Sequence, residues 1–249
     1  MIELYGCGSP NVVKIAVMLE EIGRPYRGHH VAVMHGAQFT PSFLALNPIG
    51  KVPVIVDHDG AGPDQPIFES GAILIYLAET YAPTLLPAHA PARWEVLKWL
   101  FVQVAYAGPM LGQLNHFQLV KGETDGYAAH RYRDQAARVY GDVEKRLGVV
   151  PWLGGKSYSI ADIAMYPWAG YLARHGFDPA KFPNLMAWRG RIDGRPAVKR
   201  ARAAIDALPQ NDPVNQQPLE SKNLDRFFAR TTPGPGVDFE SYMGLGPFS

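Results

Sequence analysis

The sequence predicts an α/β domain followed by an all-helical domain, and three observations lead to this fold class. Strand and helix signals alternate over residues 1–82, which indicates a small sheet covered by helices. A proline-rich stretch at residues 83–92 is typical of a linker. From residue 93 to residue 208 apolar residues recur at helical spacing, which predicts a domain built only of helices.

The first domain opens with a strand, a helix and a second strand. Residues 2–5 form a short strand candidate, and Pro10 stands where a helix can begin, because the first turn does not need its missing N–H. Apolar residues at helical spacing continue that helix to Gly23, which can end it. A second strand is expected over residues 26–33.

The same domain continues, after a connecting segment, with two strands and a helix. Residues 51–57 predict a third strand, and residues 66–69 predict a fourth. Ser70 is expected to cap a helix that runs to Tyr81 with an apolar face. The order is therefore β-α-β, a connecting segment and β-β-α, which implies a small mixed sheet.

The rest of the chain consists of predicted helices and a tail. Helices are expected over residues 94–111, 127–147, 159–175, 184–193 and 197–208. Residues 209–249 combine several prolines with aromatic residues, so we expect an irregular tail that packs on the body through its rings. Disorder of this tail is the alternative interpretation.

Composition and charge exclude several classes of function. The chain has 249 residues and a formal net charge of +1, so bulk electrostatics suggest neither nucleic acid nor a membrane surface as a partner. No signal peptide is visible, and no apolar stretch is long enough to span a bilayer, so we expect a cytoplasmic protein. Cys7 is the only cysteine, which excludes an intrachain disulfide and favours a reducing compartment.

The turn between the first strand and the first helix offers hydrogen-bond donors to a sulfur atom. A thiolate beside Ser9 and Asn11 would gain from the helix N-terminus and from hydroxyl and amide donors, and its pKa would fall. The alternative is that Ser9 only caps the helix. Cys7 lacks a second cysteine at the spacing of a redox pair, so we do not expect it to be the nucleophile. Tyr5 is a weaker candidate donor, because its strand position suits a structural residue better.

A proline inside the third strand suggests a place where an extended ligand could pair. Pro53 removes a ladder donor and therefore belongs at an edge or in a special turn. A cis Val52–Pro53 bond would leave the backbone N–H and C=O of Val52 pointing outward, where they could pair with a short peptide. The alternative is an edge-strand proline without a ligand.

The fourth strand leads into a helix start that could hold an amino-acid terminus. Free N–H groups and the positive helix end at Ser70 favour a carboxylate, and the neighbouring Glu69 could hold an ammonium group. A cation and an anion on one carbon describe an α-amino acid. The alternative is that Ser70 merely caps its helix.

The order of these signals resembles the glutathione transferase superfamily over about residues 1 to 205. The matching residues are Ser9-Pro10-Asn11, Gln38, Asn47-Pro48-Ile49-Gly50-Lys51-Val52-Pro53, Glu69-Ser70-Gly71-Ala72-Ile73, and Trp152-Leu153-Gly154-Gly155 with Ser159-Ile160-Ala161-Asp162. In the last motif Ser159 would cap a helix and Asp162 would reach back. The resemblance implies the cytosolic glutathione transferase architecture: an α/β thioredoxin-like N-terminal domain (β-α-β-α-β-β-α) and an all-α C-terminal domain.

A narrower set of motifs is similar to the bacterial Nu-class enzymes and to relatives of the yeast prion-forming nitrogen regulator. The set comprises Ser9-Pro10-Asn11, Gly36-Ala37-Gln38-Phe39, Gly108-Pro109-Met110-Leu111-Gly112-Gln113, His116-Phe117 and Arg131-Tyr132. Several relatives have threonine in place of Ser9, and the hydroxyl is kept. The Leu114-Asn115 pair is less familiar, which leaves the second substrate open.

The resemblance implies that glutathione is the co-substrate, with up to two molecules in each active site. Its implied ligands are Ser9 and Asn11 at the thiolate, Val52 and Pro53 at the cysteinyl unit, Glu69 and Ser70 at the γ-glutamyl end, and Gln38 and Lys51 at the glycyl side. Arg131, in cis or from a partner subunit, would bind glutathione carboxylates.

The resemblance also implies a pocket for a second substrate, lined by Tyr106, Met110, His116 and Phe117. For His116 and Phe117, ordinary interdomain packing is the alternative. No metal site is expected, because the histidines near residue 30 lack partners at diagnostic spacing. A homodimer is expected, in which the first domain of one chain meets the helical domain of the other.

Three functions are compatible with this reasoning. In the first, a glutathione thiolate reduces small disulfides without a protein cysteine. In the second, glutathione attacks an aromatic electrophile, for example by cleaving an aryl β-ether, with Tyr106, Phe117 and Trp168 accommodating the ring. In the third, the chain is a non-enzymatic glutathione-binding regulator, although the sequence lacks the long Asn/Gln-rich N-terminal segment of such regulators.

Overall fold

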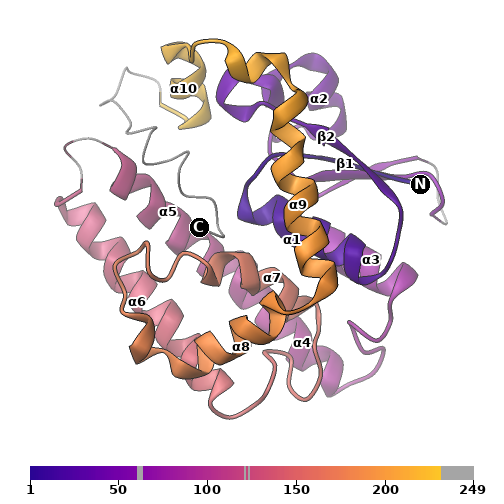
Figure 1. Cartoon of the computed structure of the whole chain (residues 1–249), viewed down its shortest axis with the longest axis vertical. Helices are drawn as coiled ribbons and strands as arrows, with labels where there is room; N and C mark the ends of the chain where they lie inside the picture. Colours follow the sequence, from indigo (N-terminus) through magenta and orange to yellow (C-terminus); the bar gives the residue numbers. More distant parts are fainter. Residues whose placement is uncertain (61–63, 121, 123, 231–249) are drawn as a thin grey trace. The chain divides into compact units, whose positions relative to one another are not determined.

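The computed structural model describes residues 1–60, 64–120, 122 and 124–230, and these residues form two compact units (Figure 1). The first unit contains residues 1–77 together with residues 196–230, and the second contains residues 78–195. The domain boundaries expected from the sequence, at residues 82, 92 and 208, stay predictions.

The first unit is built on a four-stranded sheet with the strand order β2-β1-β3-β4. Its strands are β1 (Ile2–Gly6), β2 (Tyr26–His30), β3 (Val54–Asp57) and β4 (Pro66–Phe68). β1 pairs parallel with β2 and antiparallel with β3, which pairs antiparallel with β4. The sheet is therefore mixed, as the sequence predicts, and every residue of its inner strand β3 is buried.

Three helices and two 3₁₀ turns complete the thioredoxin-like order in this part of the chain. They are α1 (Pro10–Glu21), η1 (Val33–His35), η2 (Ala37–Phe39), α2 (Pro41–Leu46) and α3 (Ser70–Tyr81). The order β-α-β-α-β-β-α confirms the expected one, since the connecting segment contains α2. Thr40 caps α2 by accepting a hydrogen bond from the Phe43 N–H at 3.4 Å, and Pro41 then occupies the first turn.

The C-terminal part of the first unit packs against its N-terminal part. Helix α9 (Pro196–Ala207) lies along α1, and Arg200 Nε donates to Glu20 Oε2 at 2.6 Å (Figure 1). In the sequence α9 follows the helices of the second unit, but its contacts place it in the first unit. A pattern of apolar residues predicts that a helix buries one face, and does not specify the partner of that face.

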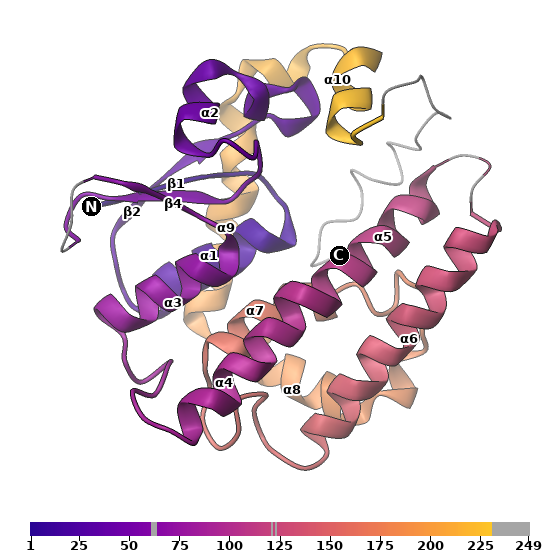
Figure 2. The same ribbon diagram turned by 180° about the vertical axis from the view of Figure 1, so that it is seen from behind.

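The tail is more ordered than the sequence analysis expects. It contains the 3₁₀ turns η5 (Leu208–Asn211) and η6 (Pro213–Gln216) and the helix α10 (Ser221–Phe227), visible in Figure 2. The prolines of the tail leave residues 219–232 uninterrupted, so a short helix can form there. The aromatic residues at 239, 242 and 248 lie outside the described residues.

The second unit consists of helices. They are α4 (Ala92–Phe101), the π-helical segment η3 (Val102–Ala107), α5 (Gly108–Leu119), α6 (Tyr127–Leu147), α7 (Ile160–Ala169), the 3₁₀ turn η4 (Pro179–Lys181) and α8 (Pro183–Asp193). All ten residues of α7 are buried, so it is the central helix of this unit. Among the described residues, none of the helices combines the length and the apolar character needed to cross a bilayer.

The helix expected over residues 94–111 is interrupted in its hydrogen-bond register. The backbone widens into the π-helical segment η3 before α5 begins. Pro109 explains this change, because it has no N–H to donate to the carbonyl four residues earlier and its ring crowds the preceding turn. π-helical geometry is rare and is found mostly as short stretches inside α-helices, as it is here between α4 and α5.

The start of α7 confirms the expected capping box. The Ser159 N–H and hydroxyl both donate to Asp162 Oδ2 at 3.0 Å, and the Ala161 N–H donates to Ser159 Oγ at 3.3 Å. Asp162 Oδ1 also accepts from the Leu153 N–H and from Trp188 Nε1, each at 2.8 Å. One buried carboxylate thus joins the start of α7, the preceding loop and α8.

Candidate functional site

The sheet register brings three predicted site segments to one edge of the sheet. Tyr5 of β1 lies opposite Val54 of β3, which lies opposite Phe68 of β4. The chain leaves β1 toward Ser9, enters β3 from Val52 and leaves β4 into Glu69 at this same edge. The segments 9–11, 51–53 and 69–70 therefore converge, although they are far apart in the sequence.

The first of these segments places Ser9 at the N-cap position of α1 and Asn11 in its first turn. The Ser9 carbonyl accepts from the N–H groups of Val12 and Val13, both at 3.0 Å. Its side chain makes no cap hydrogen bond, and its buried hydroxyl meets only a weak acceptor among the described residues, the Cys7 sulfur. The capping alternative is therefore not realised by this hydroxyl, which keeps its hydrogen-bonding capacity for another group.

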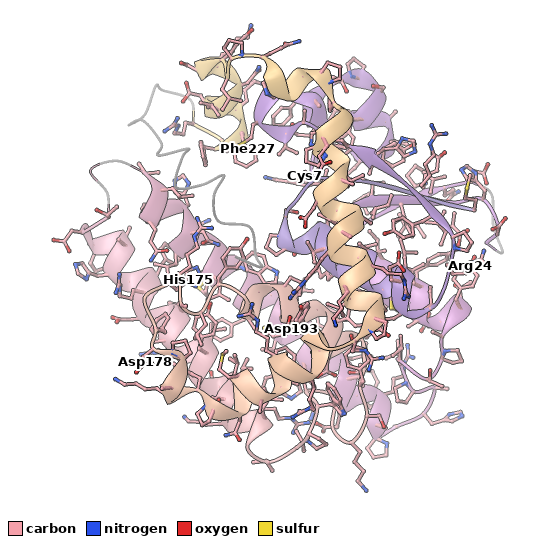
Figure 3. The ribbon with its side chains drawn as sticks, viewed as in Figure 1. Cys7, Arg24, His175, Asp178, Asp193 and Phe227 are labelled. Atoms are coloured by element: carbon pink, nitrogen blue, oxygen red, sulfur yellow. The ribbon has the colours of Figure 1, made fainter. Side chains whose placement is uncertain are left out.

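Cys7 follows β1 and is partly buried (Figure 3). Burial raises the pKa of its thiol, and the nearby Ser9 N–H and hydroxyl offset this effect only in part. Because the thiolate is the nucleophilic form of cysteine, a raised pKa makes Cys7 less reactive at neutral pH. This environment agrees with the expectation that Cys7 is not the nucleophile.

Tyr5 directs its hydroxyl toward a carboxylate. It donates to Glu3 Oε2 at 2.6 Å, and its ring stacks on that of His29 at 4.6 Å between centroids. Burial, supported by the bond to Glu3, raises the pKa of Tyr5 to about 12. These contacts support the structural interpretation of Tyr5 over a role as donor to a thiolate.

The second segment contains a cis peptide bond between Val52 and Pro53, one of the two alternatives that the sequence leaves open. Buried Asn47 shapes this loop: its Nδ2 donates to the Lys51 carbonyl at 2.8 Å, and its Oδ1 accepts from the Ile49 N–H at 3.0 Å. Among the described residues, the backbone N–H and C=O of Val52 have no hydrogen-bond partner. They remain open to an extended ligand, which is the arrangement that strand-like pairing needs.

The third segment has a strained backbone at Glu69. Glu69 has a φ of 66°, in the left-handed region that non-glycine residues rarely adopt. α3 begins at the next residue, Ser70, which is buried, and the Ile73 N–H donates to the Glu69 carbonyl at 2.9 Å. Strain of this kind is found most often where a functional geometry must be held.

Lys14 is a residue whose environment the sequence analysis does not anticipate. It lies among the buried residues of α1, with an exposed fraction of 1%. Burial lowers the pKa of Lys14 to about 7, and the opposite charge of Glu69 offsets only part of that effect. The sequence does contain a signal for it, since Lys14 is the single charge in the apolar run from Val12 to Leu19.

Gln38 lies in η2 and is almost completely buried, with an exposed fraction of 3%. Its Oε1 atom has no hydrogen-bond partner among the described residues. Lys51, its expected companion at the glycyl end, is exposed. A buried amide with an unsatisfied atom is costly unless a partner is supplied, so Gln38 stays a candidate ligand.

In the second unit, His116 and Phe117 belong to an aromatic cluster. Their rings meet edge to face at 5.2 Å, and the Phe117 ring stacks on that of Tyr132 from α6 at 5.6 Å. Met110 is partly buried on α5, and Arg131 is exposed on α6. The roles expected of these residues toward glutathione and a second substrate stay predictions.

Tyr106 lines an apolar depression formed by α4 and η3. The other lining residues are Trp94, Leu97, Lys98, Phe101 and Val102. Trp168, by contrast, is buried, and its ring lies near Gly108 and Gly112, where a Cβ atom would come within 3.8 and 3.6 Å of it. Both distances are ordinary van der Waals contacts, so the Trp168 ring packs against this part of α5.

Asn115 takes part in a buried polar chain. The His175 Nε2 atom lies 3.0 Å from Asn115 Oδ1, and His175 Nδ1 lies 2.7 Å from the Tyr140 hydroxyl. Burial lowers the pKa of His175 to about 3, so it is neutral, with Nε2–H donating to Asn115 and Nδ1 accepting from Tyr140. The unfamiliar residue at 115 is thus explained by packing inside the helical unit.

Comparisons with known proteins show which family the chain belongs to. The model of the "Glutathione S-transferase, N-terminal domain" matches residues 1–79, and that of the "Glutathione S-transferase, C-terminal domain" matches residues 105–196. The disulfide-bond oxidoreductase YfcG of Escherichia coli is 45% identical over 203 residues, which cover 81% of this chain and 94% of that protein. Protein URE2 of Candida albicans is 30% identical and covers 78% of this chain and 67% of its own length.

Two similar solved structures hold glutathione or its disulfide. A Pseudomonas fluorescens family member with two glutathione bound has a TM-score of 0.73 and 40% identity, covering 80% of this chain and 91% of its own. A Pseudomonas putida glutathione transferase with one glutathione disulfide bound per subunit has a TM-score of 0.74 and 35% identity, covering 80% and 90%. The chain belongs to the glutathione S-transferase family.

Proposed function

We propose that this chain binds glutathione in its first unit and stabilises the glutathione thiolate for exchange with small disulfides. The observation that carries the proposal is the buried hydroxyl of Ser9 at the N-terminus of α1, which makes no cap hydrogen bond and has only the weakly accepting Cys7 sulfur beside it among the described residues. A thiolate placed there would gain a charge-assisted hydrogen bond and the favourable end of the helix dipole. Asn11, in the first turn of the helix, would add an amide donor.

The convergence of three segments at one edge of the sheet supports the same binding mode. The open backbone of Val52 would pair with the cysteinyl unit of an extended tripeptide. Glu69 and Ser70, at the start of α3, would hold the ammonium and carboxylate groups of the γ-glutamyl end. Gln38 and Lys51 would reach the glycyl carboxylate.

The proposed reaction uses two glutathione molecules and no protein cysteine. The first thiolate attacks one sulfur of the substrate disulfide, so that a mixed disulfide forms and a thiolate leaves and takes up a proton. A second glutathione thiolate then attacks the glutathione sulfur of the mixed disulfide, releasing the second substrate thiol and glutathione disulfide. The substrate gains two electrons, and the two glutathione molecules lose them.

The similar proteins support disulfides over other substrates. One is named a disulfide-bond oxidoreductase, and two are solved with either two glutathione molecules or one glutathione disulfide. The raised pKa of Cys7 adds support, because the chain then needs an external thiol for exchange chemistry. The alternative, attack on an aromatic electrophile, is less well supported, because Trp168, one of the residues expected to contact the aromatic substrate, is buried.

A substrate panel tests the proposal directly. Turnover of bis(2-hydroxyethyl) disulfide, an aryl β-ether and chlorodinitrobenzene would be compared at matched glutathione concentration. We expect the disulfide to react with the highest kcat/KM. Reaction of the carbon electrophiles alone would refute the disulfide assignment, and glutathione binding without any turnover would favour a regulator.

We also propose that the apolar depression of the second unit is covered by a second copy of the chain. Trp94 and Phe101 are 62% and 57% exposed on α4, which is unusual for rings of this size. With Leu97 and Val102 they form a contiguous apolar surface that is typical of a protein interface. A homodimer would remove this surface from water.

A further inference from the structure

The segment after α9, residues 208–230, lies against the part of the first unit that carries Gln38. We call this segment the strap. Leu208 packs on Gly28 of β2, where a Cβ atom would come within 2.5 Å of the leucine Cδ2. Asp212 Oδ2 lies 2.6 Å from His30 Nδ1. Helix α10 packs on η1, and Figures 1 and 2 both show it beside the N-terminal elements of the unit.

Two side chains of α10 contact the loop on either side of Gln38. The Arg226 guanidinium lies over the Phe39 ring, 4.4 Å from its centroid. Asn223 lies against Gly36, whose φ is 81°, and a Cβ atom there would come within 3.0 Å of the asparagine Oδ1. Phe227, the last residue of the same helix, is labelled in Figure 3. The strap therefore touches both residues that bracket the Ala37–Gln38 pair.

Phe39 connects the strap to the cis-proline loop. Its ring also lies beside Gly50, where a Cβ atom would be 3.3 Å from the Phe39 Cδ1 and Cε1 atoms and from the Gln38 carbonyl oxygen. Gly50 has a φ of 65° and immediately precedes Lys51 and Val52. A contiguous path thus runs from Arg226 through the Phe39 ring to the backbone proposed to pair with glutathione.

We propose that Arg226 is a positioning residue for glutathione: by holding the Phe39 ring against Gly50, it fixes the Val52 backbone and the Gln38 turn before the ligand arrives. This inference rests on the proposed function. Backbone that is already ordered costs less entropy when an extended peptide pairs with it, so the benefit appears in affinity. The attraction between a guanidinium and an aromatic face gives the contact its strength and its dependence on charge.

Substitutions of Arg226 test the proposal in the full-length chain. Glutathione Kd would be measured by calorimetry, and KM and kcat would be measured for reduction of bis(2-hydroxyethyl) disulfide. We expect Arg226→Ala and Arg226→Gln to raise Kd and the KM for glutathione about threefold to fivefold, the size of an exposed cation–π contact, with kcat changed less than twofold. Arg226→Lys, which keeps the cation, should restore most of the affinity.

A matched control lies on the same helix. Lys222 is 76% exposed and pairs only with Glu220 among the described residues, so Lys222→Ala removes a positive charge from α10 without touching the loop. It should leave Kd and KM unchanged. An equal effect of Lys222→Ala and Arg226→Ala would mean that net charge matters and would overturn the proposed path.

A double-mutant cycle with Phe39→Leu separates positioning from general stabilisation. If Arg226 acts through the ring, Arg226→Ala should weaken binding no further once the ring is absent. Additive losses, or an unchanged Kd in Arg226→Ala and Arg226→Gln, would overturn the inference while leaving the proposed function intact. Failure of the unsubstituted chain to bind glutathione would instead remove the proposed function itself.

Discussion

Ser9 and Cys7 stand two positions apart in one turn, and their environments favour opposite roles. The buried Ser9 hydroxyl makes no cap hydrogen bond, whereas burial raises the pKa of the Cys7 thiol, an effect that this hydroxyl only partly offsets. A donor that meets only a weak acceptor among the described residues suits a ligand that brings a stronger one. The different environments support the different roles that the sequence suggests for these two residues.

Substitutions in this turn give the first prediction. Ser9→Ala should lower kcat/KM for disulfide reduction about tenfold to hundredfold, because one hydrogen bond to a developing or full negative charge is lost. Ser9→Thr should stay within a few-fold of the unsubstituted chain, since the hydroxyl is kept. Steady-state kinetics with saturating glutathione measure both.

Cys7→Ser is the matched control in the same turn. We expect it to retain most of the activity, because the proposed mechanism forms no bond to the Cys7 sulfur. A loss as large as that of Ser9→Ala would show that the protein sulfur, rather than the glutathione sulfur, takes part in the exchange.

The residue scale also shows the limits of sequence reasoning. The capping pair Ser159 and Asp162 could be expected from the motif that contains it, and the cis Val52–Pro53 bond was one of two alternatives. The burial of Lys14 beside the charge of Glu69 could not, because helical periodicity places a residue on a face and says nothing about the charge of a distant segment. Structural information was needed for that pair.

At the scale of elements, Asp162 joins the start of α7 to the loop before it and to α8. Burial, only partly offset by its four donors, raises the pKa of Asp162 to about 6. The folded chain therefore holds a proton at pH values where an unfolded aspartate, with a pKa of about 3.9, has lost it. The stabilisation that the protonated Asp162 side chain contributes is fully present below about pH 3.9 and is lost as the pH rises through about 6.

The second prediction follows from this linkage. The difference between the free energy of unfolding of the unsubstituted chain and that of Asp162→Asn should fall by about 2 kcal/mol between pH 4 and pH 7. Asparagine cannot titrate, so the variant removes this part of the pH dependence. Denaturant unfolding at several pH values measures the difference, and a difference that grows with pH would contradict the assigned pKa.

Most elements could be predicted from the sequence, and the exceptions have physical causes. The strands and the helix at residues 10–21 follow from apolar spacing, proline and glycine. The π-helical segment η3 was not expected, because periodicity hardly distinguishes a register change from a continuous helix. Helix α10 was also missed, since the frequent prolines of the tail obscured the uninterrupted stretch between them.

At the scale of the whole molecule, the packing of α9 and of the strap was beyond the sequence analysis. An apolar stripe on a helix shows that it needs a partner, and α1 provides it in the case of α9. The site of the first unit was more predictable. Its three segments are linked by strand register, which follows once the strand order is known.

The third prediction concerns assembly. We expect a homodimer at micromolar concentration, and Phe101→Glu should weaken its association at least about tenfold by placing a charge in the apolar depression. Sedimentation velocity over a concentration series measures the mass. A monomeric mass for the unsubstituted chain would contradict the proposed interface. Lys145→Glu changes a charge in the last turn of α6, on a residue that does not line the depression, and serves as the control.

The central claim is that the reactive sulfur belongs to glutathione and is stabilised as a thiolate beside Ser9. The most direct test is to titrate the ultraviolet absorbance of the thiolate in the glutathione complex, using the Cys7→Ser chain so that only the ligand contributes a thiol. The account predicts a pKa clearly below the ordinary value of about 8.5, rising by about one unit in the additional variant Ser9→Ala. A bound thiol that titrates like free glutathione in both chains would contradict it.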